Sequence, residues 1–259
     1  MNQVAIFFSV VIGLFLVMLA LMEVGWRVGV RRRSQDAAGA HVGLGVIDGA
    51  VFGLMGLLVA FTFSGAGTRF DARRRLIGEE TNAIGTAYLR VDLLPAASQP
   101  ELRDDFRNYV DARLGYYRNL GQDNAAAEAQ LDRSVALQRK IWAESVAGCE
   151  KVNFSATTSL VLSSLNEMID LTTTRAVALE THPPTVIFWA LGVLVLAGAL
   201  LAGYGMAEAK TRSWLHMLIY STILALAVYV ILDLEYPRVG WVRIDKADHV
   251  LMDLRTSMK

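Results

Sequence analysis

The sequence predicts an all-α integral membrane protein with four transmembrane helices in two pairs and a helical domain between the pairs. Two observations indicate this fold. Of the 259 residues, 54% are hydrophobic, and they gather in four long runs that contain no Asp, Glu, Lys or Arg: 1–22, 49–68, 182–207 and 213–232. The polar stretch between the second and third runs has helical periodicity.

Each apolar run is long enough to cross a bilayer. Hydrocarbon about 30 Å thick needs about 20 apolar residues in a helix. Lipid offers no hydrogen-bond partners to the backbone, so a helix is the form that such a run can take. The run 1–22 is longer than the apolar part of a secretion signal, and Arg27 and Arg31–Arg33 follow it. We therefore expect a retained membrane anchor rather than a cleaved signal.

The polar stretch 69–181 is expected to form helices. Ser98 and Glu101 have the spacing of a capping box before a helix that runs towards Gly121. Further helices are expected over about 125–147 and after Ser155. The expected buried positions have helical spacing: Leu102, Phe106, Tyr109, Val110, Leu114 and Tyr117 in the first helix, Leu131, Val135, Ile141, Trp142 and Val146 in the second, and Leu162, Leu165, Ile169, Ala176 and Leu179 in the third.

These segments predict four parts along the chain. They are a first helix pair (1–68), a soluble helical domain (69–181), a second helix pair (182–233) and a C-terminal tail (234–259). Two crossings on each side of the domain would keep the domain and both ends of the chain on one side of the membrane. Read strictly, the positive-inside rule places the short links in the cytoplasm, because they are rich in basic residues. The total count of basic residues close to the spans leans weakly towards a cytoplasmic domain instead.

A resemblance to a known family lies in the second span and its continuation. Arg69, Arg74, Arg75, Leu76, Gly78 and Asn82 coincide, without a gap, with the pore-helix pattern of bacterial bestrophins. The match covers about 51–90. A weaker similarity lies after the last span, where Glu235, Pro237 and Gly240 resemble the family's acidic-x-Pro-x-Gly turn, with two residues rather than one between the proline and the glycine. The chain resembles the bacterial bestrophin-like membrane proteins, a distant branch of the bestrophins.

The resemblance implies a pentameric ion channel whose second span lines a central pore. It implies a hydrophobic neck at Gly53, Leu57 and Phe61, which lie on one helix face because their spacing is i, i+4, i+8. Five copies of Leu57 and Phe61 would form apolar rings that gate by dewetting. The arginines at 69, 74 and 75 and Asn82 would belong to a vestibule. The partners would be the lipid bilayer of the plasma (inner) membrane, further copies of the chain and monovalent ions, with the domain in the cytoplasm.

The sequence departs from the family pattern at several points. Gly53 stands where bulky apolar residues are usual, and Thr62 and Ser64 replace a common arginine and asparagine. After the turn, Asp245 and Asp248 are too few to supply the oxygen shell that Ca²⁺ prefers. We therefore expect no calcium clasp.

Simpler interpretations stay open for these residues. The arginines at 69, 73, 74 and 75 could be interfacial anchors that extend towards lipid headgroups. The acidic residues Asp71, Glu79 and Glu80 are expected to pair with them along the helix. Gly53, Gly56, Gly65 and Gly67 could serve close helix packing, and Glu235 could be purely structural.

The sequence favours neither an enzyme nor a nucleic-acid binder. His41, His182, His216 and His249 are scattered without metal-ligand spacing, and the formal net charge is zero. We predict no catalytic residues, no metal and no cofactor. The main alternative to a channel is a non-conducting membrane sensor or scaffold whose helical domain binds a partner or ligand.

Overall fold

The protein is described by a computed structural model over residues 3–35, 44–152, 154–207, 212–238, 240–244 and 248–258. Asp245 and parts of both short links, 36–43 and 208–211, lie outside these residues. By its contacts the chain divides into two compact units. The first unit comprises Met1–Thr68 with His182–Trp241, and the second comprises Arg69–Thr181 with Val242–Lys259.

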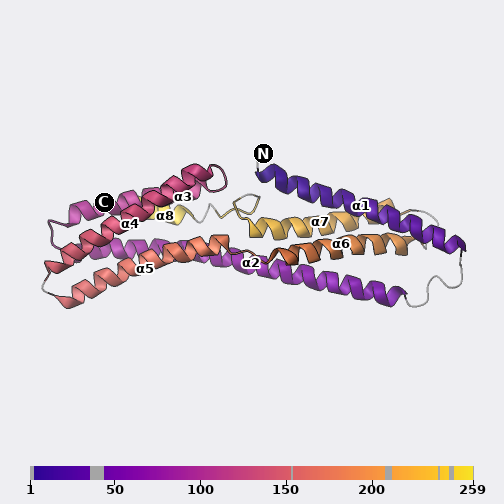
Figure 1. The fold of residues 1–259 in the computed structure, drawn as a ribbon, viewed down its shortest axis with the longest axis horizontal. Helices are drawn as coiled ribbons and strands as arrows, with labels where there is room; N and C mark the ends of the chain where they lie inside the picture. The colour runs from indigo at the N-terminus through magenta and orange to yellow at the C-terminus, as the bar shows by residue number, and fades with distance from the viewer. Residues whose placement is uncertain are drawn as a thin grey trace. The chain divides into compact units, whose positions relative to one another are not determined.

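Every regular element in the described residues is helical, which confirms the all-α prediction (Figure 1). The elements are α1 (Gln3–Gln35), α2 (Leu44–Arg90), the 3-10 helix η1 (Val91–Leu93), α3 (Gln99–Asn119), α4 (Asn124–Glu150), α5 (Ser155–Glu180), α6 (Thr185–Met206), α7 (Trp214–Glu235) and α8 (His249–Ser257). The 47-residue α2 begins in the first unit and ends in the second without interruption.

The first unit contains the membrane-spanning segments. Four helices of the described residues are long and apolar enough to cross a membrane, as the sequence predicted. In this unit α1 packs along α6 and α7 around a core that includes Met18, Met22 and Val195. At the α1–α6 crossing, a Cβ added to Gly25 would lie 2.1 Å from the Leu200 carbonyl oxygen. Glycine thus permits backbone contact between these two helices.

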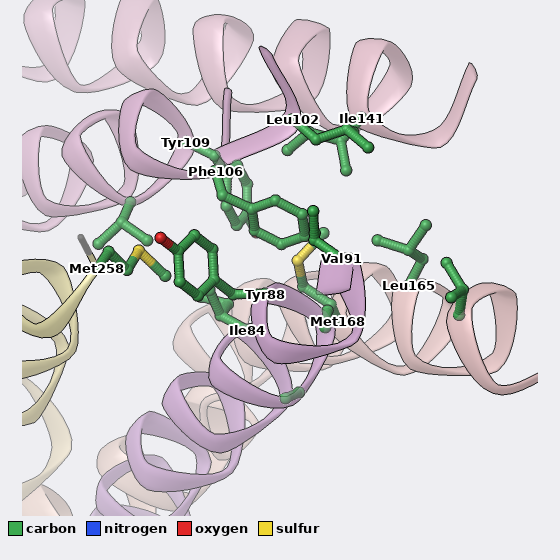
Figure 2. Packing of buried hydrophobic residues seen from close by; sticks show 14 of the residues in the cluster. Ile84, Tyr88, Val91, Leu102, Phe106, Tyr109, Ile141, Leu165, Met168 and Met258 are labelled. Atoms are coloured by element: carbon green, nitrogen blue, oxygen red, sulfur yellow. The ribbon is translucent and has the colours of Figure 1, made fainter. Parts of the chain in front are cut away.

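The second unit has its own hydrophobic core. Figure 2 shows side chains from α2, α3, α4, α5 and the end of the chain meeting there. The rings of Tyr88 on α2 and Phe106 on α3 pack edge to face with centroids 5.8 Å apart. Leu251 on α8 is fully buried in the same core, so the C-terminal segment is part of this unit.

The predicted helices of the polar stretch are present, with differences at their ends. All six residues predicted to face the core on α3 are buried. Ser98 precedes this helix, but its side chain makes no capping hydrogen bond, so the predicted capping box is wrong. The next helix, α4, is capped by Asp123, whose carboxylate accepts a 3.0 Å hydrogen bond from the Ala126 amide. Gly121, in the turn between them, has φ 77°, which glycine adopts without strain.

Candidate functional site: the exposed face of α2

The three residues predicted for a pore neck lie on an exposed face of α2. Leu57 and Phe61 are 51% and 66% exposed, although both are large and apolar. A Cβ added to Gly53 would meet nothing within 4 Å. The opposite face of the helix packs inward through Met55 and Thr62, which are buried. The single chain therefore leaves the predicted neck residues uncovered.

Exposed positions continue at helical spacing in both parts of α2. In the first unit Ser64 and Thr68 are exposed. In the second unit the exposed residues at the same spacing are Asp71, Arg75, Glu79, Asn82 and Thr86. At 3.6 residues per turn, these positions fall with Gly53 in a sector of about 80° around the helix. The face changes from apolar to polar along the chain.

The arginines predicted for a vestibule differ in environment. Arg74 and Arg75 are exposed, and they pair along the helix with Asp71 at 3.9 Å and with Glu79 at 3.4 Å. Surface pairs of this kind contribute about 0–1 kcal/mol. Arg69 is half-buried. The local acid–base pairs balance the charge of the exposed arginines.

Arg73 is buried and caps another helix. Its Nε donates to the Ala178 carbonyl at 3.0 Å, and its Nη2 donates to the Thr181 carbonyl at 2.9 Å. Carbonyls at a helix C-terminus lack intrahelical donors and carry partial negative charge. Arg73 therefore stabilises the end of α5, a role that helical spacing within α2 could not indicate.

Glu80 was expected to pair with neighbouring arginines of its own helix, and this expectation is wrong. Its side chain is fully buried and points to other helices. Glu80 Oε1 accepts a 2.7 Å hydrogen bond from Arg113 Nε on α3, and Oε2 pairs with Arg175 on α5. Burial alone would raise the pKa of Glu80, but the two guanidinium groups outweigh it and hold the pKa below its ordinary value.

Tyr117 and Asp248 complete this buried cluster. The Tyr117 hydroxyl donates to Glu80 Oε2 at 3.0 Å, and its ring lies 3.5 Å from the Arg175 guanidinium carbon. Burial and the charge of Glu80 raise the pKa of Tyr117 well above its ordinary value, so its hydroxyl keeps its proton. Arg175 Nη2 also donates to Asp248 Oδ1 at 2.9 Å. The cluster links α2, α3, α5 and the residue that precedes α8.

Asn82 lines a groove between α2 and α5. The groove has a volume of about 610 Å³, and eight of its ten lining residues have polar side chains. Glu79 and Thr86 lie beside Asn82 on the α2 wall, and Glu167 and Asp170 lie on the α5 wall. The sequence could place Asn82 on a helix but could not identify the helix opposite it.

The predicted post-span turn is held by side chains of the first unit. Glu235 is buried, with Oε1 2.9 Å from His182 Nδ1 at the start of the second helix pair. Pro237 is also buried. The Trp241 amide donates to Asp233 Oδ2 at 3.1 Å, and a Cβ added to Gly240 would lie 1.6 Å from Asp233 Oδ1. These contacts favour a structural interpretation of the turn.

Within the described residues, no group of three or more His, Cys, Asp or Glu side chains could hold a metal ion. Asp248, considered above as a calcium ligand, is bonded to Arg175.

Fold and site together define a multi-pass α-helical membrane protein whose second span continues into a helical domain. A family model described as a Bestrophin-like domain matches residues 12–248, and the chain belongs to this family. The resemblance seen in the sequence is thus confirmed.

Solved structures with the same fold include those of a bacterial bestrophin homologue. A variant of the bestrophin homologue from Klebsiella pneumoniae superposes with a TM-score of 0.71 at 14% identity, over 96% of this chain and 98% of that chain. Another crystal structure of the Klebsiella homologue gives 0.69 at 15% identity, over 95% and 98%. A structure of a membrane protein variant gives 0.70 at 16%, over 95% and 99%. At identities this low, the likeness shows the fold alone. No curated protein matches the chain by sequence.

Proposed function

We propose that the protein is an oligomeric ion channel of bestrophin type, in which monovalent ions flow passively along a central pore lined by α2. Bestrophins are ion channels rather than enzymes, and membership of the family is the first support. The observation that carries the proposal is the exposed face of α2, on which Leu57 and Phe61 lie in line with the polar residues Asn82 and Thr86. Because Asn82 and Thr86 belong to the second unit, their polarity is expected there; the support is that one sector of α2 stays uncovered in both its apolar and its polar part.

The glycines of α2 support assembly from several copies of the chain. Gly25 and Gly203 lie at contacts between two helices of the same chain, because an added Cβ would strike the backbone of the opposing helix. In contrast, Gly53, Gly56 and Gly67 of α2 have nothing within 4 Å of an added Cβ. Small residues let membrane helices approach closely, so the positions of Gly56 and Gly67 are suited to a neighbouring copy. The pentamer is proposed from the family resemblance.

In this assembly Leu57 and Phe61 form the neck. Rings of apolar side chains exclude water when the pore is narrow, and ions cannot cross a dry constriction at low cost. Gly53, one helical turn before Leu57, gives a wider ring. Arg75 and Asn82 lie on this face in the polar part of the pathway, where Asp71 and Glu79 offset the arginine charge, and Arg69 and Arg74 are proposed to flank it. The channel is proposed to lie in the plasma (inner) membrane.

Ion flux through liposomes that contain the purified protein tests the proposal. Replacement Phe61→Ala should widen the neck and raise monovalent-ion flux severalfold. The matched control is Phe63→Ala, because Phe63 is also exposed, at 47%, but points about 160° away around the helix. This control should leave flux close to that of the unaltered protein.

Two results would contradict a pore along α2. One is the absence of flux from both the unaltered protein and Phe61→Ala while both remain folded oligomers in the membrane. The other is an equal change of flux in Phe61→Ala and Phe63→Ala, because a general loosening of the helix would explain it.

A further inference from the structure

Basic side chains from two membrane helices meet at one end of the first unit. The end of α1 and the start of α7 lie together there, beside the short links (Figure 1). Arg27 Nε donates to Glu23 Oε1 at 2.7 Å, and Arg212 Nη2 lies 3.1 Å from the same oxygen. The Arg212 guanidinium carbon also lies 4.3 Å from the centroid of the Trp26 ring. We refer to these four residues as the Arg27–Arg212 cluster.

The cluster holds two positive charges against one carboxylate. Among the described residues, Glu23 is the one acidic partner of either arginine, and its side chain is 17% exposed. A guanidinium group has five N–H donors in a planar fork, and the Arg27 side chain is 63% exposed. Donors of both arginines are therefore available to an acceptor outside the chain.

Two buried polar atoms of the same cluster lack a partner. Trp26 Nε1 and Glu23 Oε2 are buried, and neither has a hydrogen-bond partner in the described part of the chain. Buried polar atoms in proteins are normally hydrogen-bonded to protein or to ordered water. The described chain thus leaves the cluster incomplete, which points to a group from its surroundings.

Further arginines extend the positive surface along α1. Arg31 lies about one helical turn beyond Arg27, and Arg32 follows it. Both are exposed, and neither pairs with an acidic side chain of the described residues. In the sequence, the stretches 23–36 and 208–212 together carry six basic and three acidic residues. This end of the membrane unit therefore has an excess of positive charge.

The basic patch lies where phospholipid headgroups begin. Arg27 comes five residues after the uncharged run 1–22, and Arg212 comes two residues before α7. Exposed apolar side chains adjoin the patch, among them Val24 on α1 and Leu215 on α7. An anion held by the arginines has apolar surface directly beside it. This combination suits a lipid better than a small soluble anion.

We propose that this patch binds the headgroup of an anionic phospholipid. The lipid phosphate accepts charge-assisted hydrogen bonds from the remaining N–H groups of Arg27 and Arg212. Arg31, one turn away, adds to the attraction for the negative charge. The acyl chains lie along the exposed apolar surface of Val24 and Leu215. A zwitterionic lipid offers the same phosphate but also carries a cationic group, which the arginines repel.

The proposal is independent of ion conduction. It is tested by native mass spectrometry of the purified full-length protein in detergent, titrated with phosphatidylglycerol or with phosphatidylcholine that has the same acyl chains. We expect the unaltered protein to bind phosphatidylglycerol about tenfold more tightly than phosphatidylcholine. No flux is measured, so an absence of conductance in liposomes would leave this result unaffected.

Two variants locate the site. Replacement of Arg27 and Arg212 together by glutamine should abolish the preference for phosphatidylglycerol. Because these changes leave the Glu23 carboxylate without its cations, they can also disturb the fold. The second variant, Arg31→Gln combined with Arg32→Gln, leaves the Arg27–Arg212 cluster intact and should reduce the preference severalfold.

The matched control is Arg133→Gln combined with Arg139→Gln, which removes two exposed arginines of α4 in the second unit. This control should keep the full preference. Equal affinity of the unaltered protein for the two lipids would overturn the proposal, and so would an equal loss in the α4 control or an unchanged preference in both α1 variants. Complete displacement of phosphatidylglycerol by inorganic phosphate at the same concentration would also overturn it, because the patch would then recognise soluble anions.

Discussion

Glu80 on α2 joins this helix to α3 and α5 in the second unit. Its carboxylate is fully buried and bonded to Arg113 and Arg175, and Arg175 is in turn bonded to Asp248. Two carboxylates and two guanidinium groups balance each other in this cluster. Removing one member leaves an uncompensated buried charge, and that cost exceeds the net contribution of the intact cluster.

Replacement Glu80→Gln should lower the free energy of unfolding by about 3–5 kcal/mol. The amide keeps the shape of the side chain but cannot balance the charges of Arg113 and Arg175. The measurement is thermal or denaturant unfolding of the purified protein in detergent. Glu79→Gln is the matched control, because its exposed pair with Arg75 contributes about 0–1 kcal/mol. Equal losses in the two variants would contradict the role assigned to Glu80.

The same variant should change the pH dependence of stability. The pKa of Glu80 is lowered from an ordinary value of 4.5, so the unfolded chain takes up this proton at a higher pH than the folded protein does. The contribution of Glu80 is therefore complete above about pH 4.5 and declines as the pH falls towards the lower folded pKa. Unfolding measured between about pH 6 and about pH 3 should show a shallower acid decline in Glu80→Gln. An identical decline would assign the acid sensitivity to other carboxyl groups.

Among the elements, the α1–α6 pair shows how glycine sets the distance between two membrane helices. A Cβ added to Gly203 would lie 2.0 Å from the Met22 carbonyl oxygen, and one added to Gly25 would meet Leu200. Both obstacles are backbone atoms, which cannot rotate away as a flexible side chain can. The helices would have to separate.

Replacement Gly203→Ala should therefore destabilise the membrane unit by about 1–3 kcal/mol. The matched control is Gly205→Ala on the same helix, where an added Cβ meets nothing within 4 Å. Alanine favours a helix over glycine, so the control should be neutral or slightly stabilising. Thermal unfolding in one detergent compares the two proteins. A stable Gly203→Ala variant would mean that the helices adjust to the extra methyl group.

The helices also show which structural features the sequence could predict. Apolar periodicity identified the large apolar side chains on the buried face of α3, but not Asp105, Ala112 and Arg113, which are buried there as well. On α4 Ile141 is buried as predicted, whereas Leu131, Val135, Trp142 and Val146 are half-buried, and Trp142 packs against the core. Ser134 and Gln138 are also buried, which apolar periodicity could not indicate. Gln138 donates to the Tyr109 hydroxyl at 3.1 Å, a contact that depends on a distant helix and leaves no local pattern.

For the whole molecule, the order of apolar and polar segments was enough to predict the architecture. Hydrocarbon thickness requires long uncharged runs, and these runs are visible in the sequence. Long-range pairings were not visible. Arg73 was considered an interfacial anchor and Glu80 a partner of neighbouring arginines, but both are bonded to residues about a hundred positions away or on other helices. The neck and vestibule residues stay a prediction that the proposed flux experiment tests.

The C-terminal segment is another long-range feature. It was predicted as a separate tail, and its final helix packs in the core of the second unit. Replacement Leu251→Ala should destabilise that unit by about 2–5 kcal/mol, because it removes a fully buried side chain. Val250→Ala, at a position that is 45% exposed, is the control and should have little effect. Unfolding that is unchanged in Leu251→Ala would show that the segment is dispensable to the unit.

The turn after α7 has a consequence for reading related sequences. A Cβ at position 240 would overlap Asp233 Oδ1, so a chain that keeps this turn and this position of the carboxylate keeps glycine there, and a larger residue requires the Asp233 side chain to move. An alignment in which this glycine never varies would record a steric exclusion. Residues of that kind are poor markers of an ion pathway. Residues that determine ion selectivity should instead be sought at exposed positions such as Phe61, where the fold of the single chain tolerates many side chains.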